Sequence, residues 1–141
     1  MKNFHSFNSL FENIEYIAAE ENYDKFCDIN KDNEKRRALS CFFANLMLMD
    51  IIDRELMIDL INNLIDKQRD SFGDINKKKV IDEIAENIFI LITLGKSHLY
   101  THEKWKQIYR YIENISNAST SLYAGLSNKT IFKFMDILET I

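Results

Sequence analysis

The chain has 141 residues, of which 46% are hydrophobic, and its formal net charge is −4. This length suits one domain, and the acidic balance argues against strong non-specific nucleic-acid binding by the whole chain. No apolar run reaches the roughly 18–20 residues of a membrane span, and the first residues lack the apolar core of a signal peptide. We therefore expect a cytoplasmic protein without a membrane partner. Proline is absent and glycine occurs three times, which favours helices throughout.

Two helices are predicted in the amino-terminal third. The first covers about residues 6–26, where apolar residues recur at helical spacing opposite a row of acids. The polar segment 28–33 follows and is expected to form a loop. A second helix over about 34–49 would place its apolar residues inward, namely Ala38, Phe42, Phe43 and Leu46.

The middle of the chain predicts a second helix pair. Asp53 is a suitable N-cap for a third helix. After a break at 67–76, a fourth helix covers about 77–94 and is apolar all round at 88–92, which predicts a central position. Gly95 is expected to end this helix as a C′ glycine.

A third pair is predicted at the carboxyl end. Thr101 is expected to cap a fifth helix, whose apolar stripe begins at Trp105. The segment 117–126 is rich in Ser and is expected to form a loop. The sixth helix covers about 127–141.

The helix pairs are similar in length. Apolar stripes begin near Phe7, Leu56 and Trp105, about 48 residues apart, and HEAT or armadillo units repeat at roughly 40–47 residues. We therefore predict an all-α fold, a HEAT-like α-solenoid of three antiparallel helix pairs that forms a single domain over 1–141. The apolar face that reaches Ile141 leaves open that the chain is a fragment of a longer solenoid. The expected core includes Phe42, Leu60, Ile88, Leu91, Trp105 and Phe134.

Two patterns suggest metal ligands but are incomplete. The segment 28–32 resembles the start of an EF-hand loop, yet Asn33 and Leu39 stand where the loop requires Gly and a bidentate Glu. His98 and His102 have the i, i+4 spacing of helical metal ligands without a third ligand of suitable spacing. We expect no metal site.

Residues for catalysis are also missing. The sequence has no nucleophile elbow, no phosphate-binding glycine loop and no Cys-x-x-Cys motif. Cys27 and Cys41 are expected to be reduced thiols, because no secretory signal is present. We therefore expect a non-enzymatic protein without a cofactor or a small-molecule substrate.

A basic and aromatic cluster suggests contact with RNA. Lys104, Lys106 and Arg110 lie close in sequence to Trp105 and Tyr109. Cations mixed with aromatic rings can bind single-stranded nucleic acid by charge and stacking. Trp105 also belongs to the inward stripe of its helix, so core packing is the alternative role for it.

Three segments carry a family resemblance. The first is Lys35–Leu39 with Phe42–Leu46, the second is Leu91–Lys96, and the third is Ser127–Lys129 with Asp136–Leu138. In this order and spacing they resemble the middle domain of translation initiation factor 4G, over about residues 34–141. The similarity is to the carboxyl-terminal three repeats of that five-repeat, HEAT-type domain.

The resemblance implies a scaffold that binds a DEAD-box helicase of initiation factor 4A type, and RNA contacts are known in the family. It implies partner-binding roles for Lys96, after the fourth helix, and Lys129, at the start of the sixth. The alternative roles are a helix C-terminal charge for Lys96 and a solvated loop for Lys129. Where the family has two further cations, this sequence has Ile131 and Ile141.

A second class of protein also fits the composition. An all-helical chain of this size, rich in Lys and Asn, is compatible with a viral protein of the Bcl-2 type, which captures a host peptide helix in a groove. The apolar segment 88–92 would then form the central buried helix. Stacked antiparallel pairs would favour the solenoid, whereas one helix wrapped by the others would favour the groove fold.

Overall fold

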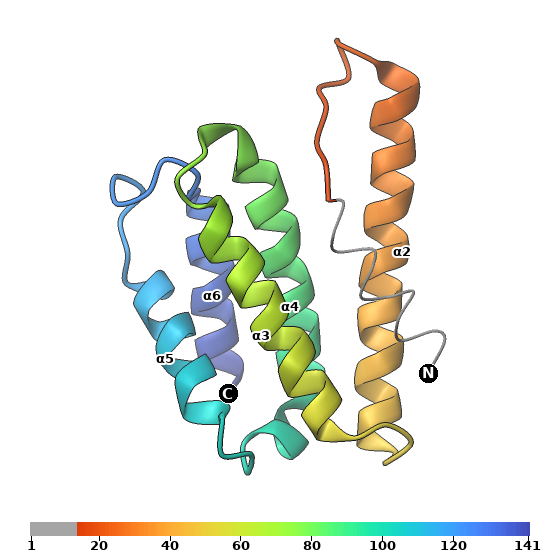
Figure 1. Ribbon diagram of the computed structural model, residues 1–141, viewed down its shortest axis with the longest axis vertical. Coiled ribbons are helices and arrows are strands. Elements are labelled where there is room, and N and C mark those ends of the chain that lie inside the picture. Colours follow the sequence, from red (N-terminus) through yellow and green to blue (C-terminus); the bar gives the residue numbers. More distant parts are fainter. Residues whose placement is uncertain (1–13) are drawn as a thin grey trace.

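The computed structural model describes residues 14–141, and this part of the chain is all-helical, which confirms the predicted class. Five α-helices and one short 3₁₀ helix follow one another (Figure 1). Their bounds are α2 Tyr23–Leu48, α3 Arg54–Ser71, η1 Ile75–Lys77, α4 Lys78–Leu99, α5 Trp105–Ser116 and α6 Asn128–Thr140.

Helix α4 lies in the middle of the molecule. It packs against α2, α3 and α6, while α5 packs against α6. Arg37 of α2 contacts Glu83 of α4, and Met47, later in α2, contacts Gly95, later in α4. These two helices therefore run in the same direction. Helix α6 runs the same way, and α3 and α5 run the opposite way (Figure 1). The helices thus form two layers, one of α2, α4 and α6 and one of α3 and α5.

The hydrogen bonds between distant side chains share one sequence separation. In residues 14–141 the side-chain hydrogen bonds that join different helices or their connections link residues 43 to 49 positions apart, except the bond from Gln68 to a carbonyl 13 positions away. The backbone bond from the Gly125 amide to the Phe72 carbonyl joins residues 53 positions apart. Ser40 of α2 donates to Asn87 of α4 at 2.7 Å, 47 positions away. Tyr111 of α5 donates to Gln68 of α3 at 2.7 Å, 43 positions away. Neighbouring helices of the same layer, such as α2 and α4 or α3 and α5, are therefore separated by 43–49 residues in the sequence.

The core confirms four of the six predicted residues. Leu60, Ile88, Leu91 and Phe134 are at most 1% exposed. Phe42 is 48% exposed, so its prediction is wrong, because the neighbouring Phe43 takes the buried position on α2. Trp105 is only half-buried, so its prediction is confirmed in part: it packs against the core from the first position of α5, and its ring also contacts Tyr100 and Tyr109. Most of the large side chains that are fully buried belong to α3 and α4.

The predicted loop at 28–33 is wrong, because α2 is continuous from Tyr23 to Leu48. The side chain of Asn22 accepts a hydrogen bond from the Lys25 amide at 3.0 Å and caps the helix at its start. The segment has no glycine or proline, and its polar residues lie on the exposed side of the helix while Ile29 is buried. The predicted first helix is not found in residues 14–22, and residues 6–13 lie outside the described part of the chain.

Two predicted helix boundaries near the end of α4 are also wrong. Gly95 is buried inside α4, which continues to Leu99, so Gly95 is not a C′ residue. Thr101 does not cap α5, since the cap position is Lys104 and the Thr101 hydroxyl instead accepts a bond from Arg54 at 2.6 Å. The predicted cap of α3 is confirmed, because the Asp53 carboxylate accepts from the Glu55 amide at 3.0 Å.

Buried polar contacts hold the register between α2 and α4. The guanidinium of Arg37 donates two bonds to the carboxylate of Glu83, at 2.6 and 3.2 Å, and Glu83 is 4% exposed. Asn87 donates to the Glu83 carbonyl and accepts from Ser40. Burial lowers the pKa of Arg36, and the nearby Glu83 carboxylate opposes this effect. A slip of either helix would separate these groups and leave a buried charge without its partner.

Candidate partner-binding surface

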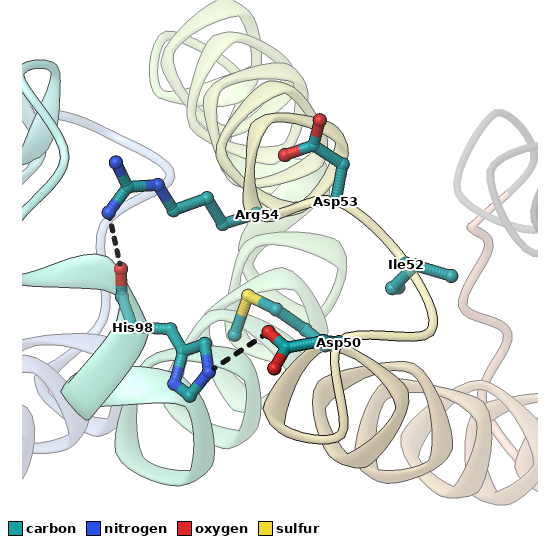
Figure 2. A pocket seen from close by; sticks show the side chains of 6 residues that line it. Asp50, Ile52, Asp53, Arg54 and His98 are labelled. Carbon is teal, nitrogen blue, oxygen red and sulfur yellow. Dashed lines mark hydrogen bonds and ion pairs between the residues drawn. The ribbon is translucent and has the colours of Figure 1, made fainter.

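Two adjoining pockets lie where the α2–α3 turn, the end of α4 and the α4–α5 connection meet (Figure 2). The first has a volume of about 430 Å³ and the second about 520 Å³, and Asp53 and Arg54 line both. The first is lined further by Met47, Asp50, Ile52 and His98. This end of the molecule is therefore hollowed, with carboxylates and one histidine at its surface.

A Schellman motif at the end of α2 places Asp50 beside the first pocket. The amide of Ile51 donates to the Leu46 carbonyl at 2.9 Å, and the amide of Asp50 donates to the Met47 carbonyl at 3.0 Å. Asp50 has a φ of 59°, the left-handed conformation that this motif requires and that Asp tolerates better than most residues. Its carboxylate lies 3.6 Å from Nε2 of His98, an ion pair whenever that imidazole is protonated.

Arg54 joins the start of α3 to the end of α4. Its guanidinium donates to the Thr101 hydroxyl at 2.6 Å. It also donates to the His98 carbonyl at 3.5 Å, as Figure 2 shows. The carbonyl belongs to the last turn of α4, where helix carbonyls lack partners within the helix. Arg54 therefore holds the connection after α4 against α3 and shapes the wall between the two pockets.

A carboxylate, an imidazole and an ammonium group connect α3 to the start of α5. The Lys104 amide donates to Nδ1 of His102 at 3.1 Å, so in the neutral ring the proton is on Nε2, which donates to the Glu55 carboxylate. The Lys104 ammonium donates to the same carboxylate at 3.1 Å. The bonds from His102 and Lys104 lower the pKa of Glu55 below its ordinary value, and the Glu55 carboxylate raises the pKa of Lys104.

The two histidines therefore do not converge on a common point. His98 faces Asp50, whereas His102 is 7% exposed and bonded to Glu55. In the described part of the chain no group of three or more His, Cys, Asp or Glu residues could hold a metal ion. The segment 28–32, which resembles the start of an EF-hand loop, lies within helix α2.

The rim of this surface is apolar and exposed. Met49 is 68% exposed and Ile51 is 60% exposed, on either side of Asp50 at the α2–α3 turn. Exposed large apolar side chains grouped beside polar ones are typical of protein-interaction sites. Three pairs of lining side chains interact with one another, namely Arg54 with Thr101, Asp50 with His98 and Glu55 with His102, so this surface suits the docking of a protein better than the chemistry of a small substrate.

The predicted RNA-contact residues divide into two groups. Lys106 and Arg110 are exposed on α5, one turn apart, beside a row of rings in which Tyr100 and Trp105 are 5.4 Å apart and Trp105 and Tyr109 are 6.5 Å apart. Lys104 is engaged elsewhere, since its ammonium is bonded to Glu55. Of the three predicted cations, two are thus placed beside the aromatic row.

The predicted partner-binding lysines are at opposite ends of the molecule. Lys96 lies near the end of α4, and its ammonium donates to the Thr140 carbonyl in the last turn of α6 at 2.8 Å. Lys129 is exposed in the first turn of α6. Because a helix rises about 1.5 Å per residue, the length of α6 separates the two ends. Only Lys96 is on the side of the two pockets.

Sequence reasoning missed Asp50, Arg54, Met49 and Ile51. The one available signal was local: an apolar pair in the short connection before the Asp53 cap, which is unusual for a solvated turn. The partners of Asp50 and Arg54 are 44 to 48 positions away, so the sequence did not indicate them.

Comparisons of this chain with protein-family models, with curated proteins and with solved structures found no match. Within residues 14–141, no helix combines the length and the apolar character that a membrane crossing requires.

Proposed function

We propose that this chain is a non-enzymatic, cytoplasmic scaffold of the initiation factor 4G middle-domain type, built as a HEAT-like solenoid, and that it binds a DEAD-box helicase of initiation factor 4A type. The supporting observation is the shared separation of 43–49 residues in the long-range side-chain hydrogen bonds. In a solenoid each unit contacts only its neighbours, so contacts between units have one characteristic sequence separation.

The direction of the helices supports stacked units over a groove-bearing bundle of the Bcl-2 type. Helices α2, α4 and α6 follow one another in one layer and point the same way, while α3 and α5 form the second layer (Figure 1). In a bundle wrapped around one central helix, nothing requires that successive helices of one layer point the same way at a constant sequence interval. Two complete pairs, α3 with α4 and α5 with α6, are described, and α2 supplies one helix of a third.

The family-like segments fall on equivalent helices. The segment with Arg36 and Arg37 lies in α2, Leu91–Lys96 lies in α4, and Ser127 caps α6 by accepting from the Thr130 amide at 3.3 Å. Each segment thus belongs to the layer of α2, α4 and α6. This agreement between a sequence resemblance and a structural repeat is a further reason to favour the factor 4G class.

We place the helicase at the pocket end, because this end combines two exposed apolar residues with charged groups at its edge. Met49 and Ile51 would supply the buried contacts, and Lys96, bonded to the Thr140 carbonyl of α6, would lie at the same end of the molecule. Small interfaces of this kind depend on a few apolar anchors, and charged residues at the rim set the association rate. Lys129, at the other end, would then contribute nothing to helicase binding.

RNA is the second proposed partner, at a different surface. The aromatic row of Tyr100, Trp105 and Tyr109, with Lys106 and Arg110 exposed on α5, suits stacking of single-stranded bases and pairing with phosphates. Binding of a single-stranded RNA oligonucleotide should weaken in the Lys106→Glu, Arg110→Glu double variant and with added salt. Unchanged binding in that variant would remove RNA from this surface.

The helicase proposal is tested by interferometry with a purified 4A-type helicase and matched variants. Ile51→Glu should weaken binding by about tenfold or more, as loss of an apolar anchor does. Ile75→Glu is the control, since Ile75 is 63% exposed in η1, at the opposite end of α3. Lys96→Glu should weaken binding and Lys129→Glu should not. Failure of the parent chain to bind would overturn the helicase assignment, and equal loss in Ile51→Glu and Ile75→Glu would overturn the placement.

A further inference from the structure

One face of α6 is uncovered among the described residues. Asn128, Phe132, Met135 and Glu139 recur at intervals of four, three and four residues, so they lie on one side of the helix. All four are exposed, and Phe132 is 58% and Met135 40% exposed. Two large apolar side chains, one turn apart, thus face away from the core.

The same face of α4 receives a neighbouring helix. Glu86 and Phe89 stand 46 positions before Phe132 and Met135. The Glu86 carboxylate lies 3.3 Å from the ammonium of Lys133 on α6, and that ammonium lies 4.5 Å from the centre of the Phe89 ring. On α4, these positions are therefore contact positions for the next helix of the layer.

The pattern repeats one helix earlier. Ser40 and Phe43 of α2 stand 46 positions before Glu86 and Phe89. Ser40 donates to Asn87 of α4 at 2.7 Å, and Phe43 is 2% exposed. Each preceding helix of the layer therefore uses this face in packing. On α6 the face is equally suited to packing and is more apolar, but no described residue covers it.

We propose that this face docks on the same face of a second copy of the chain, with the two α6 helices antiparallel about a two-fold axis. Lys129 lies one turn before Phe132, and Glu139 lies one turn after Met135. In an antiparallel pair, Lys129 of each copy faces Glu139 of the other, so the two opposite-charge contacts form at once. Phe132 and Met135 of both copies pack together at the centre of the interface. A parallel pair would instead place like charges opposite each other.

The expected dimer is weak and reversible. A contact of one helix per copy is smaller than the roughly 800 Å² per partner of a standard interface. The apolar centre supplies the attraction, and the paired charges select the antiparallel orientation. Such a two-fold interface is closed, so association stops at two copies.

The first test is sedimentation equilibrium of the 141-residue chain over a range of concentrations. The parent should change from the monomer mass of 16.7 kDa toward twice that value as the concentration rises. Phe132→Glu should remain a monomer throughout, with an unchanged helical circular-dichroism spectrum. Met49→Glu is the control, because Met49 is also exposed but lies at the end of α2, and it should dimerise as the parent does.

The second test is a charge exchange, which addresses the orientation. Lys129→Glu alone should reduce dimerisation, because it faces Glu139 of the other copy. Adding Glu139→Lys to that variant should restore the dimer. A parent that stays at 16.7 kDa at every concentration would overturn the proposal, as would a Phe132→Glu variant that dimerises normally. If the double exchange does not restore the dimer, the antiparallel pairing is wrong.

Discussion

The terminal methyl carbon of Met47 on α2 lies only 2.5 Å from the position that a Cβ atom on Gly95 of α4 would occupy. Gly95 is buried in the interior of α4, and Met47 is 1% exposed. The absence of a side chain at Gly95 therefore lets the end of α2 approach α4 closely. This contact closes one side of the first pocket, because Met47 also lines it.

The first prediction concerns this contact. Gly95→Ala should change the free energy of unfolding by no more than about 1 kcal/mol. The higher helix propensity of Ala stabilises α4 by about that amount, and the flexible end of Met47 can move into the adjacent pocket to make room for the methyl group. Gly95→Leu should cost about 1–3 kcal/mol, since the larger side chain overfills the contact. Urea unfolding measures both. The double variant Met47→Ala, Gly95→Leu should recover part of the loss, and a fully additive loss would mean that the two residues are not coupled.

The other two glycines, Gly73 and Gly125, offer a matched comparison for the second prediction. A Cβ atom on Gly125 would lie 2.7 Å from the Asp74 carbonyl oxygen and 2.9 Å from that of Ser71, whereas one on Gly73 would meet nothing within 4 Å. Backbone atoms cannot move as a flexible side chain does, so Gly125→Ala should cost about 1–3 kcal/mol. Gly73→Ala should be within about 0.5 kcal/mol of the parent. Equal melting temperatures for the two variants would contradict this account of the loop before α6.

The buried carboxylate of Glu83 provides the third prediction. Its side chain is 5% exposed and lies between the guanidinium of Arg37, which is bonded to it, and that of Arg36, which is 3% exposed and 3.9 Å away, so Glu83→Ala should cost about 3–5 kcal/mol, the range for removing one partner of a buried ion pair. Glu86→Ala is the control, because the Glu86 side chain is 19% exposed against 5% for Glu83, so its pair with Lys133 should contribute less, about 1 kcal/mol. Chemical unfolding followed by circular dichroism gives both values. A loss at Glu83 no larger than at Glu86 would show that the α2–α4 register does not depend on this ion pair.

The fourth prediction is a pH dependence at Glu55. The hydrogen bond from His102 and then that from Lys104 lower the pKa of this carboxyl below 4.5 in the folded chain. A lowered pKa stabilises the fold above about pH 4.5, and this contribution is lost as the pH falls through the folded-state value. Glu55→Gln should therefore lower the melting temperature near pH 7 and approach the parent near pH 3. Glu113→Gln, at an exposed position on α5, controls for the loss of one negative charge.

Features that depend on a few neighbouring residues were predictable from the sequence. The caps of α3 and α6 involve side chains and amides two or three positions apart, and both Asp53 and Ser127 lie where a helix start was expected. The helical class follows from the near absence of glycine and proline, and the repeat spacing from the recurrence of apolar stripes. The apolar character of 88–92 likewise placed α4 in the centre, which the packing confirms.

Features that depend on residues 43–49 positions away were decided only by the tertiary structure. Residues 28–33 are helical, although their local composition favours a loop, because they belong to a long helix that packs on α4, and packing stabilises helices more than propensity does. The local sequence predicts a helix end at Gly95, but the role of this glycine is set by Met47 on another helix. The pockets, and the positions of Lys96 and Lys129 at opposite ends, follow from how the two layers align. The sequence by itself determined the helical class and the caps of α3 and α6, since these arise from short-range forces. The packing of whole helices decided which side chains are exposed, paired or brought together.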